Sequence, residues 1–203
     1  MLLDLIRKGG PIMWPLLLTS LLAVTVVIER LLFIMRERKK RRPDLVEQIL
    51  ANAEKGNFQK AIQVSEGSED FIVRVLLSGL THREKSFSSA LLRAANKELT
   101  RFNQGLSILD TIITLAPLLG LLGTITGMIR AFGLLGAKEL DAPTAITGGI
   151  AEALLATAFG LTIAIIALIP FNYLNARMEE ARHEIEDAST HLELFLMEPG
   201  KKP

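Results

Sequence analysis

The sequence predicts an all-α integral membrane protein with three transmembrane helices, two of them long and extended into the cytoplasm, and a small helical cytoplasmic domain. A soluble domain of 203 residues rarely reaches the mean hydropathy of +0.34 found here. Hydrophobic residues make up 49% of the chain and fall in long uncharged runs. Charged residues still make up 22%, so apolar and polar stretches alternate along the sequence. This segregation is typical of a membrane protein.

The first span is predicted at the N-terminus. A bilayer core about 30 Å thick needs about 20 apolar helical residues, and residues 9–28 carry no charge. Arg7 and Lys8, which precede this run, would also suit a cleaved signal peptide. However, no small-residue cleavage site follows, and the run ends in charged residues. We therefore expect residues 1–35 to form a short outer segment and a retained transmembrane helix.

A helical cytoplasmic domain is expected at residues 36–104. Short amphipathic patterns over 44–55, 58–64 and 71–80 are separated by breaks that each contain a glycine. From residue 86 onward, apolar residues recur at three- and four-residue intervals, and no proline interrupts them before the second span. This pattern predicts one unbroken helix that begins in the cytoplasm and continues through the membrane.

The second and third spans are predicted at residues 105–132 and 145–174, joined by a short periplasmic loop at 133–144. The second span contains a long run without charge, whereas the third carries one ionisable residue, Glu152. The chain then continues as a cytoplasmic helix and tail, 175–203. One side of this extension is charged. Another side carries an apolar stripe that should pack against the helix leading into span two and against neighbouring subunits, formed by Met178, Ile185, Leu192 and Phe195.

Positive charge near the span ends predicts the orientation. Six Lys and Arg residues lie within 36–42, and this block should stay in the cytoplasm. The 133–144 loop carries only Lys138 as a basic residue, as a translocated loop should. The N-terminus is then periplasmic and the C-terminus cytoplasmic. Arg7 and Lys8 oppose this assignment but are outnumbered.

Composition excludes several other functions. The formal net charge of +1 gives no electrostatic basis for binding nucleic acid. The chain has no cysteine, and its three histidines lie in polar segments without metal-ligand spacing, so neither a metal nor a cofactor is expected. No nucleophile–base or metalloprotease motif occurs, so we do not expect an enzyme.

Small residues form rows along both inner spans, and such rows allow helices to approach closely in lipid. Pro117 within span two frees a backbone carbonyl and should bend that helix. The residues predicted to pack are Gly120, Gly123 and Gly127 in span two and Gly148, Ala156 and Gly160 in span three.

Glu152 stands out because an ionised carboxylate in a membrane span should face a partner or a wet cavity. Thr124, Thr126 and Thr157 add hydroxyl groups at membrane depth. A lone threonine usually bonds its own helix backbone, but several beside a carboxylate favour a proton or ion path. Packing alone stays open as the alternative. Asp110, at the inner end of span two, is interpreted either as an interfacial residue or as part of the path entrance.

Two strings carry a resemblance to a known family. Residues 116–129, APLLGLLGTITGMI, and residues 148–161, GGIAEALLATAFGL, resemble the two signatures of the MotA/TolQ/ExbB proton channel family. The Glu29-Arg30 pair at the end of span one is also similar. The MotA branch has four spans and a larger inner domain, so the resemblance is closer to ExbB and TolQ, and ExbB is favoured.

The resemblance implies a function. Such proteins form homo-oligomeric rings, best described as pentamers, around the membrane helices of an ExbD- or TolR-like partner, whose aspartate takes and releases the proton. Thr124, Glu152 and Thr157 match the family's path residues. Proton flow would drive a TonB- or TolA-like protein from the inner membrane, for outer-membrane import or envelope maintenance.

Two rival interpretations remain. The chain could be a passive membrane scaffold, because small-residue helices also build inert bundles, or a stator subunit of another MotA-related system. Because Glu152 and the hydroxyl groups lie on spans two and three, we expect these spans to line the ring. Span one would then lie outside, against lipid. The sequence leaves open whether the driving ion is a proton or sodium.

Overall fold

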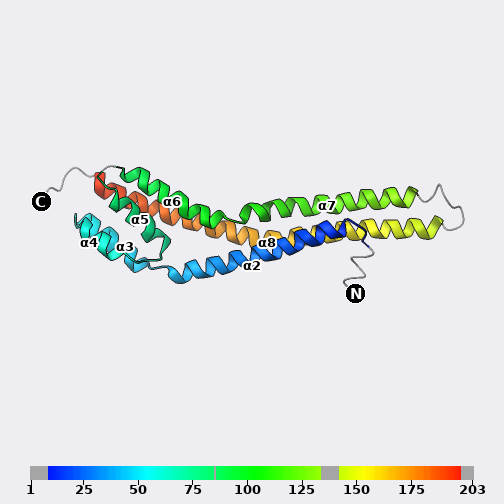
Figure 1. The fold of residues 1–203 in the computed structure, drawn as a ribbon, viewed down its shortest axis with the longest axis horizontal. Coiled ribbons are helices and arrows are strands. Elements are labelled where there is room, and N and C mark those ends of the chain that lie inside the picture. Colours follow the sequence, from blue (N-terminus) through cyan, green and yellow to red (C-terminus); the bar gives the residue numbers. More distant parts are fainter. Residues whose placement is uncertain (1–8, 85, 134–141, 198–203) are drawn as a thin grey trace. The chain divides into compact units, whose positions relative to one another are not determined.

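The computed structural model describes residues 9–84, 86–133 and 142–197. The helices of these residues are α2 (Met13–Lys40), α3 (Pro43–Glu54), α4 (Phe58–Ser65), α5 (Phe71–Thr81), α6 (Phe87–Asn103), α7 (Leu106–Gly133) and α8 (Ala142–Met197) (Figure 1). The predicted all-α class is confirmed. Within the predicted 133–144 loop, residues 134–141 lie outside the described residues, and the side chains of residues 142–144 are not described either. Residues 1–8 and the tail beyond 197 also lie outside the described residues.

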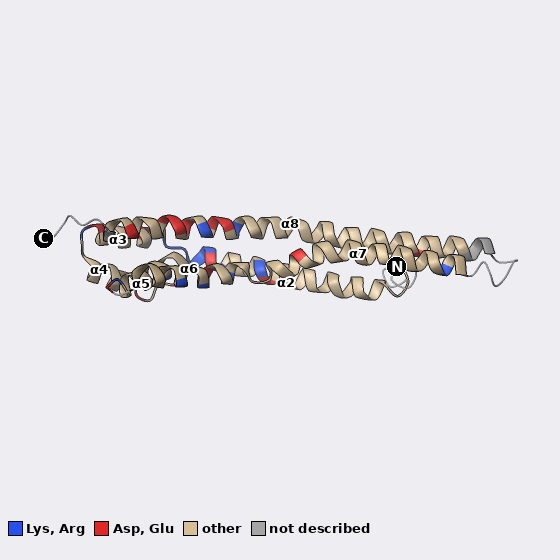
Figure 2. Cartoon of the chain, turned by 90° about the horizontal axis from the view of Figure 1, so that it is seen from above, with Lys and Arg blue, Asp and Glu red and all other residues tan. Residues whose placement is uncertain are grey.

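Three stretches in the described part of the chain are long and apolar enough to cross a membrane: Met13–Lys40, Phe87–Gly133, which comprises α6 and α7, and Ile146–Leu196. Charged side chains are sparse on α7 and on the first part of α8, and they gather on α3 to α6 and on the last part of α8 (Figure 2). The prediction of three transmembrane helices is therefore confirmed.

One expectation about the second span is wrong. The helix predicted to run unbroken from residue 86 is interrupted, because α6 ends at Asn103 and α7 begins at Leu106. Gly105 between them has a φ of +80°, a left-handed conformation that favours glycine. A Cβ atom there would lie 3.2 Å from Val26 Cγ1 and 3.3 Å from Arg30 Cδ. Because Gly105 has no side chain, Val26 and Arg30 of α2 can lie close to the backbone at this break.

The chain divides into two compact units, of which the first comprises residues 1–30 and 105–173. Within it, α7 and α8 meet along a line of small residues, and the start of α2 adds Met13 and Leu16 to a cluster around Ala116. Large apolar side chains remain exposed on all three helices, as lipid-facing surfaces require. Those on α2 include Trp14, Leu18, Leu21, Leu22 and Ile28.

The second unit comprises residues 31–104 and 174–203. The short helices α3, α4 and α5 follow the three predicted patterns closely. The core is centred on α5, most of whose apolar side chains are buried. The end of α8 contributes a stripe at alternating intervals of four and three residues, as in a coiled-coil seam: Leu174, Met178, Ala181, Ile185, Ala188 and Leu192.

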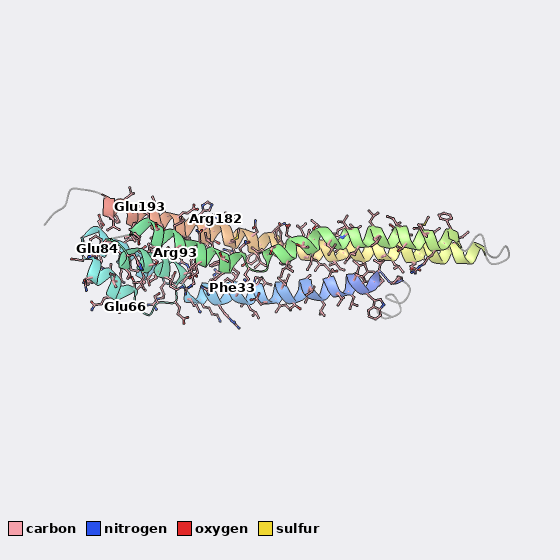
Figure 3. All side chains as sticks on the ribbon, turned by 45° about the horizontal axis from the view of Figure 1, so that its top comes forward. Phe33, Glu66, Glu84, Arg93, Arg182 and Glu193 are labelled. Atoms are coloured by element: carbon pink, nitrogen blue, oxygen red, sulfur yellow. The ribbon has the colours of Figure 1, made fainter. Side chains whose placement is uncertain are left out.

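Aromatic contacts join helices within the second unit. Phe33 of α2 points toward α6 (Figure 3), where its ring centroid lies 5.3 Å from that of Phe102 in an edge-to-face arrangement. Phe71 of α5 makes a similar contact with Phe102 at 5.1 Å. Such pairs contribute about 0.5–1.5 kcal/mol beyond the burial of their area. Phe102 therefore holds segments of three helices together.

Ion pairs also tie this unit together. Asp70 is fully buried and caps α5 by accepting a hydrogen bond from the Ile72 backbone N–H at 2.8 Å. It accepts further bonds from the Arg42 backbone N–H and from the Arg41 guanidinium, the latter at 2.7 and 2.8 Å. Arg41 also donates to Glu184 of α8. One arginine thus joins the end of α2, the start of α5 and α8.

Two carboxylates of this unit have opposite pKa shifts. Burial raises the pKa of Glu184, and the attraction of Arg41 offsets this only in part. Burial would also raise the pKa of Glu98, but hydrogen bonds and charges from Arg74 and Arg101 outweigh it, so the pKa of Glu98 lies below its usual value. The Arg74 guanidinium donates to both Glu98 oxygens, at 3.0 and 2.7 Å.

Candidate functional site

The site is built on the contact between α7 and α8 in the first unit. The α7 residues buried there are small: Ala116, Gly120, Gly123, Gly127 and Ala131. The α8 side is formed by the glycines and alanines at 149, 153, 156, 160 and 164. Close approach of two backbones is the expected use of small residues in membrane helices.

Several glycines lie where a Cβ atom would be crowded by the facing helix or would overlap it. At Gly120 a Cβ would lie 3.0 Å from Thr157 Cα and 3.1 Å from the Ala156 carbonyl oxygen. At Gly127 it would lie 3.0 Å from Ala153 Cβ. At Gly160 it would overlap the Ala116 carbonyl oxygen, and at Gly123 it would overlap Ala156 Cβ. The structure thus places these predicted packing residues in the α7–α8 contact.

The outer end of the α8 row differs from the sequence prediction by one residue. Gly148 is exposed, and no atom lies within 4 Å of the position a Cβ would take. Its neighbour Gly149 makes the contact instead, with a Cβ position 2.6 Å from Ala131 Cβ. Likewise Ala153, not Glu152, is the buried member of the row. The shift matters because it leaves Glu152 beside the helix contact and not within it.

Thr157 lies in the α7–α8 contact. Its hydroxyl donates to the carbonyl oxygen of Gly120 at 3.1 Å, across the two helices. This bond is possible because Gly120 has no side chain to separate the backbones. Thr157 therefore ties α8 to α7, which is a packing role, while its oxygen lone pairs remain able to accept.

Thr124 lies one turn beyond Gly120 on α7 and outside the packed row. Its hydroxyl donates to the Leu121 carbonyl of its own helix at 2.6 Å, and Thr126 similarly bonds the carbonyls of Leu122 and Gly123. Thr124 lines a shallow hollow on the surface of α7 with Ile125, Met128, Ile129 and Phe132. This apolar face is available to another helix.

Glu152 has a partner that no sequence pattern indicated. The Arg130 guanidinium donates to Glu152 Oε1 at 3.0 Å, from the last turn of α7. The Glu152 side chain is 23% exposed and that of Arg130 is 53% exposed. Charged groups inside membranes commonly pair with one another in this way. Among the contacts of the described residues, Glu152 is joined to neither Thr124 nor Thr157.

The segment before α2 lies against the same carboxylate. A Cβ atom at Gly10 would overlap Glu152 Oε1 and lie 3.1 Å from its Cγ. Gly10 has a φ of +73°, and its carbonyl accepts a hydrogen bond from the Met13 backbone N–H. Glu152 is therefore held between the end of α7 and the start of α2.

The remaining predicted residues are placed as follows. Pro117 lies inside α7, which continues through it, so the predicted bend stays a prediction. A second internal proline, Pro170, occurs in α8. Asp110 is exposed one turn from the start of α7. No cluster of three or more His, Cys, Asp or Glu side chains that could hold a metal occurs among the described residues.

Neither Arg130 nor Gly10 is predicted as a site residue from the sequence. Arg130 directly follows the uncharged run of span two, so the sequence marks it only as the residue at which that run ends. Its spacing from Glu152 follows no local pattern, because the two residues are joined through the connection between two spans. The available signal was that Glu152 needs a counter-charge and that Arg130 is a basic residue next to the predicted outer loop.

The fold and the site together define a multi-pass membrane protein whose second and third spans meet along small residues beside a charged pair. Residues 65–187 match the family described as the MotA/TolQ/ExbB proton channel family. The chain belongs to this family, in its ExbB-like branch. It is accordingly a multi-pass inner-membrane protein of a channel and transport family.

Individual relatives agree with this assignment. Biopolymer transport protein ExbB-like 1 of Synechocystis sp. is 38% identical over 210 residues, which cover 100% of this chain and 82% of that protein. ExbB-like 3 of the same organism is 35% identical over 92% of this chain and 90% of its own length. The Tol-Pal system protein TolQ of Haemophilus influenzae is 38% identical over 46% of this chain and 41% of its own length.

Proposed function

We propose that the chain is the ring-forming subunit of a proton-driven motor in the inner membrane. A single-span partner of the ExbD/TolR type would lie inside the ring, which we expect to be a pentamer. The complex would convert the proton gradient into mechanical work on a TonB/TolA-like protein. Membership of a proton channel family and kinship with biopolymer transport proteins support this proposal.

The observation that carries the proposal is Glu152. It lies in the apolar part of α8, is mostly buried, and accepts a hydrogen bond from the Arg130 guanidinium. Maintaining an ion pair at membrane depth is costly, which argues for a function beyond packing. Thr124 and Thr157 are proposed to line the same path, because both hydroxyl oxygens keep lone pairs that can accept a proton donor.

The orientation is part of the proposal. The basic block at 36–42 would hold the second unit in the cytoplasm, with the N-terminus and the 133–144 connection in the periplasm. Arg130 and Glu152 would then lie toward the periplasmic side and Thr157 deeper, by about 7.5 Å along α8 at 1.5 Å per residue. Protons would therefore meet Glu152 first.

A passive scaffold is the second candidate, and the contacts of the threonines favour it. Thr157 spans the α7–α8 contact, and Thr124 bonds its own helix. If these residues only pack, their hydroxyl groups serve the fold and carry no ion. Glu152 separates the two candidates, because neither the bond of Thr157 to α7 nor the bond of Thr124 within α7 requires the Glu152 carboxylate.

The test compares Glu152→Gln and Thr157→Val in cells that depend on the complex for energised uptake. We expect Glu152→Gln to abolish uptake and Thr157→Val to reduce it, with rings that remain intact by native mass spectrometry. Thr162→Val is the matched control, because Thr162 is an exposed residue of the same helix that bonds its own backbone at 2.7 Å. Normal uptake by both path variants with intact rings would leave the scaffold as the function.

A further inference from the structure

The Arg130–Glu152 pair lies where two spans approach their outer connection. Arg130 is in the last turn of α7, which ends at Gly133, and Glu152 lies ten residues after the start of α8 at Ala142. The guanidinium is on a long, half-exposed side chain, whereas the carboxylate is mostly buried. Of the two groups, Arg130 therefore has the greater freedom to leave.

Glu152, the less exposed member of the pair, is held from two sides. Arg130 Nη1 donates to Oε1 at 3.0 Å, and the Gly10 backbone packs against the same carboxyl group so closely that no side chain would fit there. Movement of Glu152 toward the start of α2 is thus blocked. Without Arg130 the carboxylate would be free to turn away from α7.

The pair also fixes the orientation of the carboxylate. While Oε1 accepts the Arg130 hydrogen bond, the carboxyl group is held toward the end of α7. Exchange of Arg130 to another anion would free it. A surface ion pair is easily exchanged, whereas one at membrane depth requires a replacement partner.

From this geometry we propose that Arg130 is a latch on the path: it holds Glu152 in the resting ring and releases it when an acidic side chain of the partner helix competes for the guanidinium. No covalent bond changes in this step, because one ion pair is exchanged for another. The inference rests on the proposed function. It adds a positioning residue that acts through Glu152, and it predicts a ring that leaks when the latch is removed.

The test measures proton entry into proteoliposomes that contain the full-length chain without partner, under an imposed potassium diffusion potential. Arg130→Gln should raise the leak about tenfold, as expected for a resting state that is mainly closed. Arg130→Lys should stay near the wild-type leak. Arg130→Gln combined with Glu152→Gln should return to background, because the leak passes through Glu152.

A charge-rescue experiment separates the latch from a structural role. The chain has no cysteine, so Arg130→Cys introduces a single half-exposed thiol. Modification of that thiol with a cationic aminoethyl methanethiosulfonate should suppress the leak, while an anionic sulfonate reagent of similar size should not. A merely structural role of Arg130 would make the two reagents equivalent.

The possible results separate the Arg130 latch from the proposed function. A leak of Arg130→Gln equal to wild type, with rings intact by native mass spectrometry, would overturn the latch and leave the proposed function standing. Equal effects of the two thiol reagents would overturn it as well. If Glu152→Gln with the partner present still conducts, the proposed function itself fails. Arg177→Gln, which breaks the Arg177–Glu180 pair of the second unit, is the control for loss of an arginine.

Discussion

At the scale of single residues, the two units use charge differently. In the second unit, charged side chains form interlocked pairs with short distances, such as Arg41 with Asp70 and Arg74 with Glu98. In the first unit the Arg130–Glu152 pair lies among apolar and small residues. The former pairs join segments of the second unit, whereas the latter is the pair that we propose to be exchanged. The predictions at this scale follow from that difference.

Asp70→Ala should destabilise the second unit by about 3 kcal/mol. The change removes the cap of α5, worth about 1 kcal/mol, and also leaves Arg41 with only one carboxylate. Thermal unfolding of the full chain in detergent, followed by circular dichroism, would measure the loss. Asp44→Ala is the control, because Asp44 is exposed on α3, and its effect should stay within about 0.5 kcal/mol. Equal unfolding temperatures for the two variants would contradict the account.

Glu98 should make stability depend on pH. Its folded-state pKa is depressed because Arg74 and Arg101 outweigh burial, so its contribution is present above the usual pKa of about 4.5 and is lost as pH falls through the lower folded value. Glu98→Gln should therefore be less stable than wild type at pH 7, with the difference shrinking below pH 4.5.

Unfolding temperatures measured between pH 3 and 7 would check this. Glu66→Gln is the control for replacing a glutamate, since Glu66 is exposed at the end of α4 (Figure 3). A Glu98→Gln variant whose deficit stayed constant down to pH 3 would show that the carboxylate charge contributes nothing.

At the scale of helices, the α7–α8 contact is set by glycine and alanine, and the sequence predicted much of it. The structure places Gly120, Gly127 and Gly160 of the small-residue rows at points of close approach. The rows did not indicate the change from Gly148 to Gly149, because one residue rotates a helix position by about 100° and composition alone cannot choose between adjacent glycines.

The α7–α8 contact gives a matched pair of substitutions. Gly160→Ala should destabilise the first unit by about 1–3 kcal/mol, because the new Cβ would overlap the Ala116 carbonyl oxygen and the helices would have to separate. Gly148→Ala should be neutral or slightly stabilising, because its Cβ meets open space and alanine favours helix. Thermal stability in detergent measures both, and a reversed order would show that α7 and α8 are not in such close contact.

At the scale of the whole molecule, hydropathy was enough to predict three spans, because bilayer thickness imposes a length that few soluble helices meet. Glycine breaks likewise predicted the short helices of the second unit. The break at Gly105 was not predicted, because the apolar residues on either side of it keep their three- and four-residue spacing, and the positive φ there accompanies the close approach of α2. The Arg41–Asp70–Glu184 cluster joins distant segments, which no local pattern reveals.

The same limit applies to the site. Glu152 could be singled out because a carboxylate in an apolar run is costly, wherever the chain folds. Its partner Arg130 depends on how two spans are placed side by side, and so does the bond from Thr157 to Gly120. The sequence therefore indicated which groups carry charge and polarity, while the fold determined which of them meet.

The central claim is that protons cross the membrane by way of Glu152. The most direct measurement is proton influx into proteoliposomes that contain the chain with its single-span partner, under an imposed membrane potential, for wild type, Glu152→Gln and the Thr162→Val control. Wild type and the control should show influx, and Glu152→Gln should show none above empty liposomes. Wild-type influx through an intact Glu152→Gln ring would contradict the central claim.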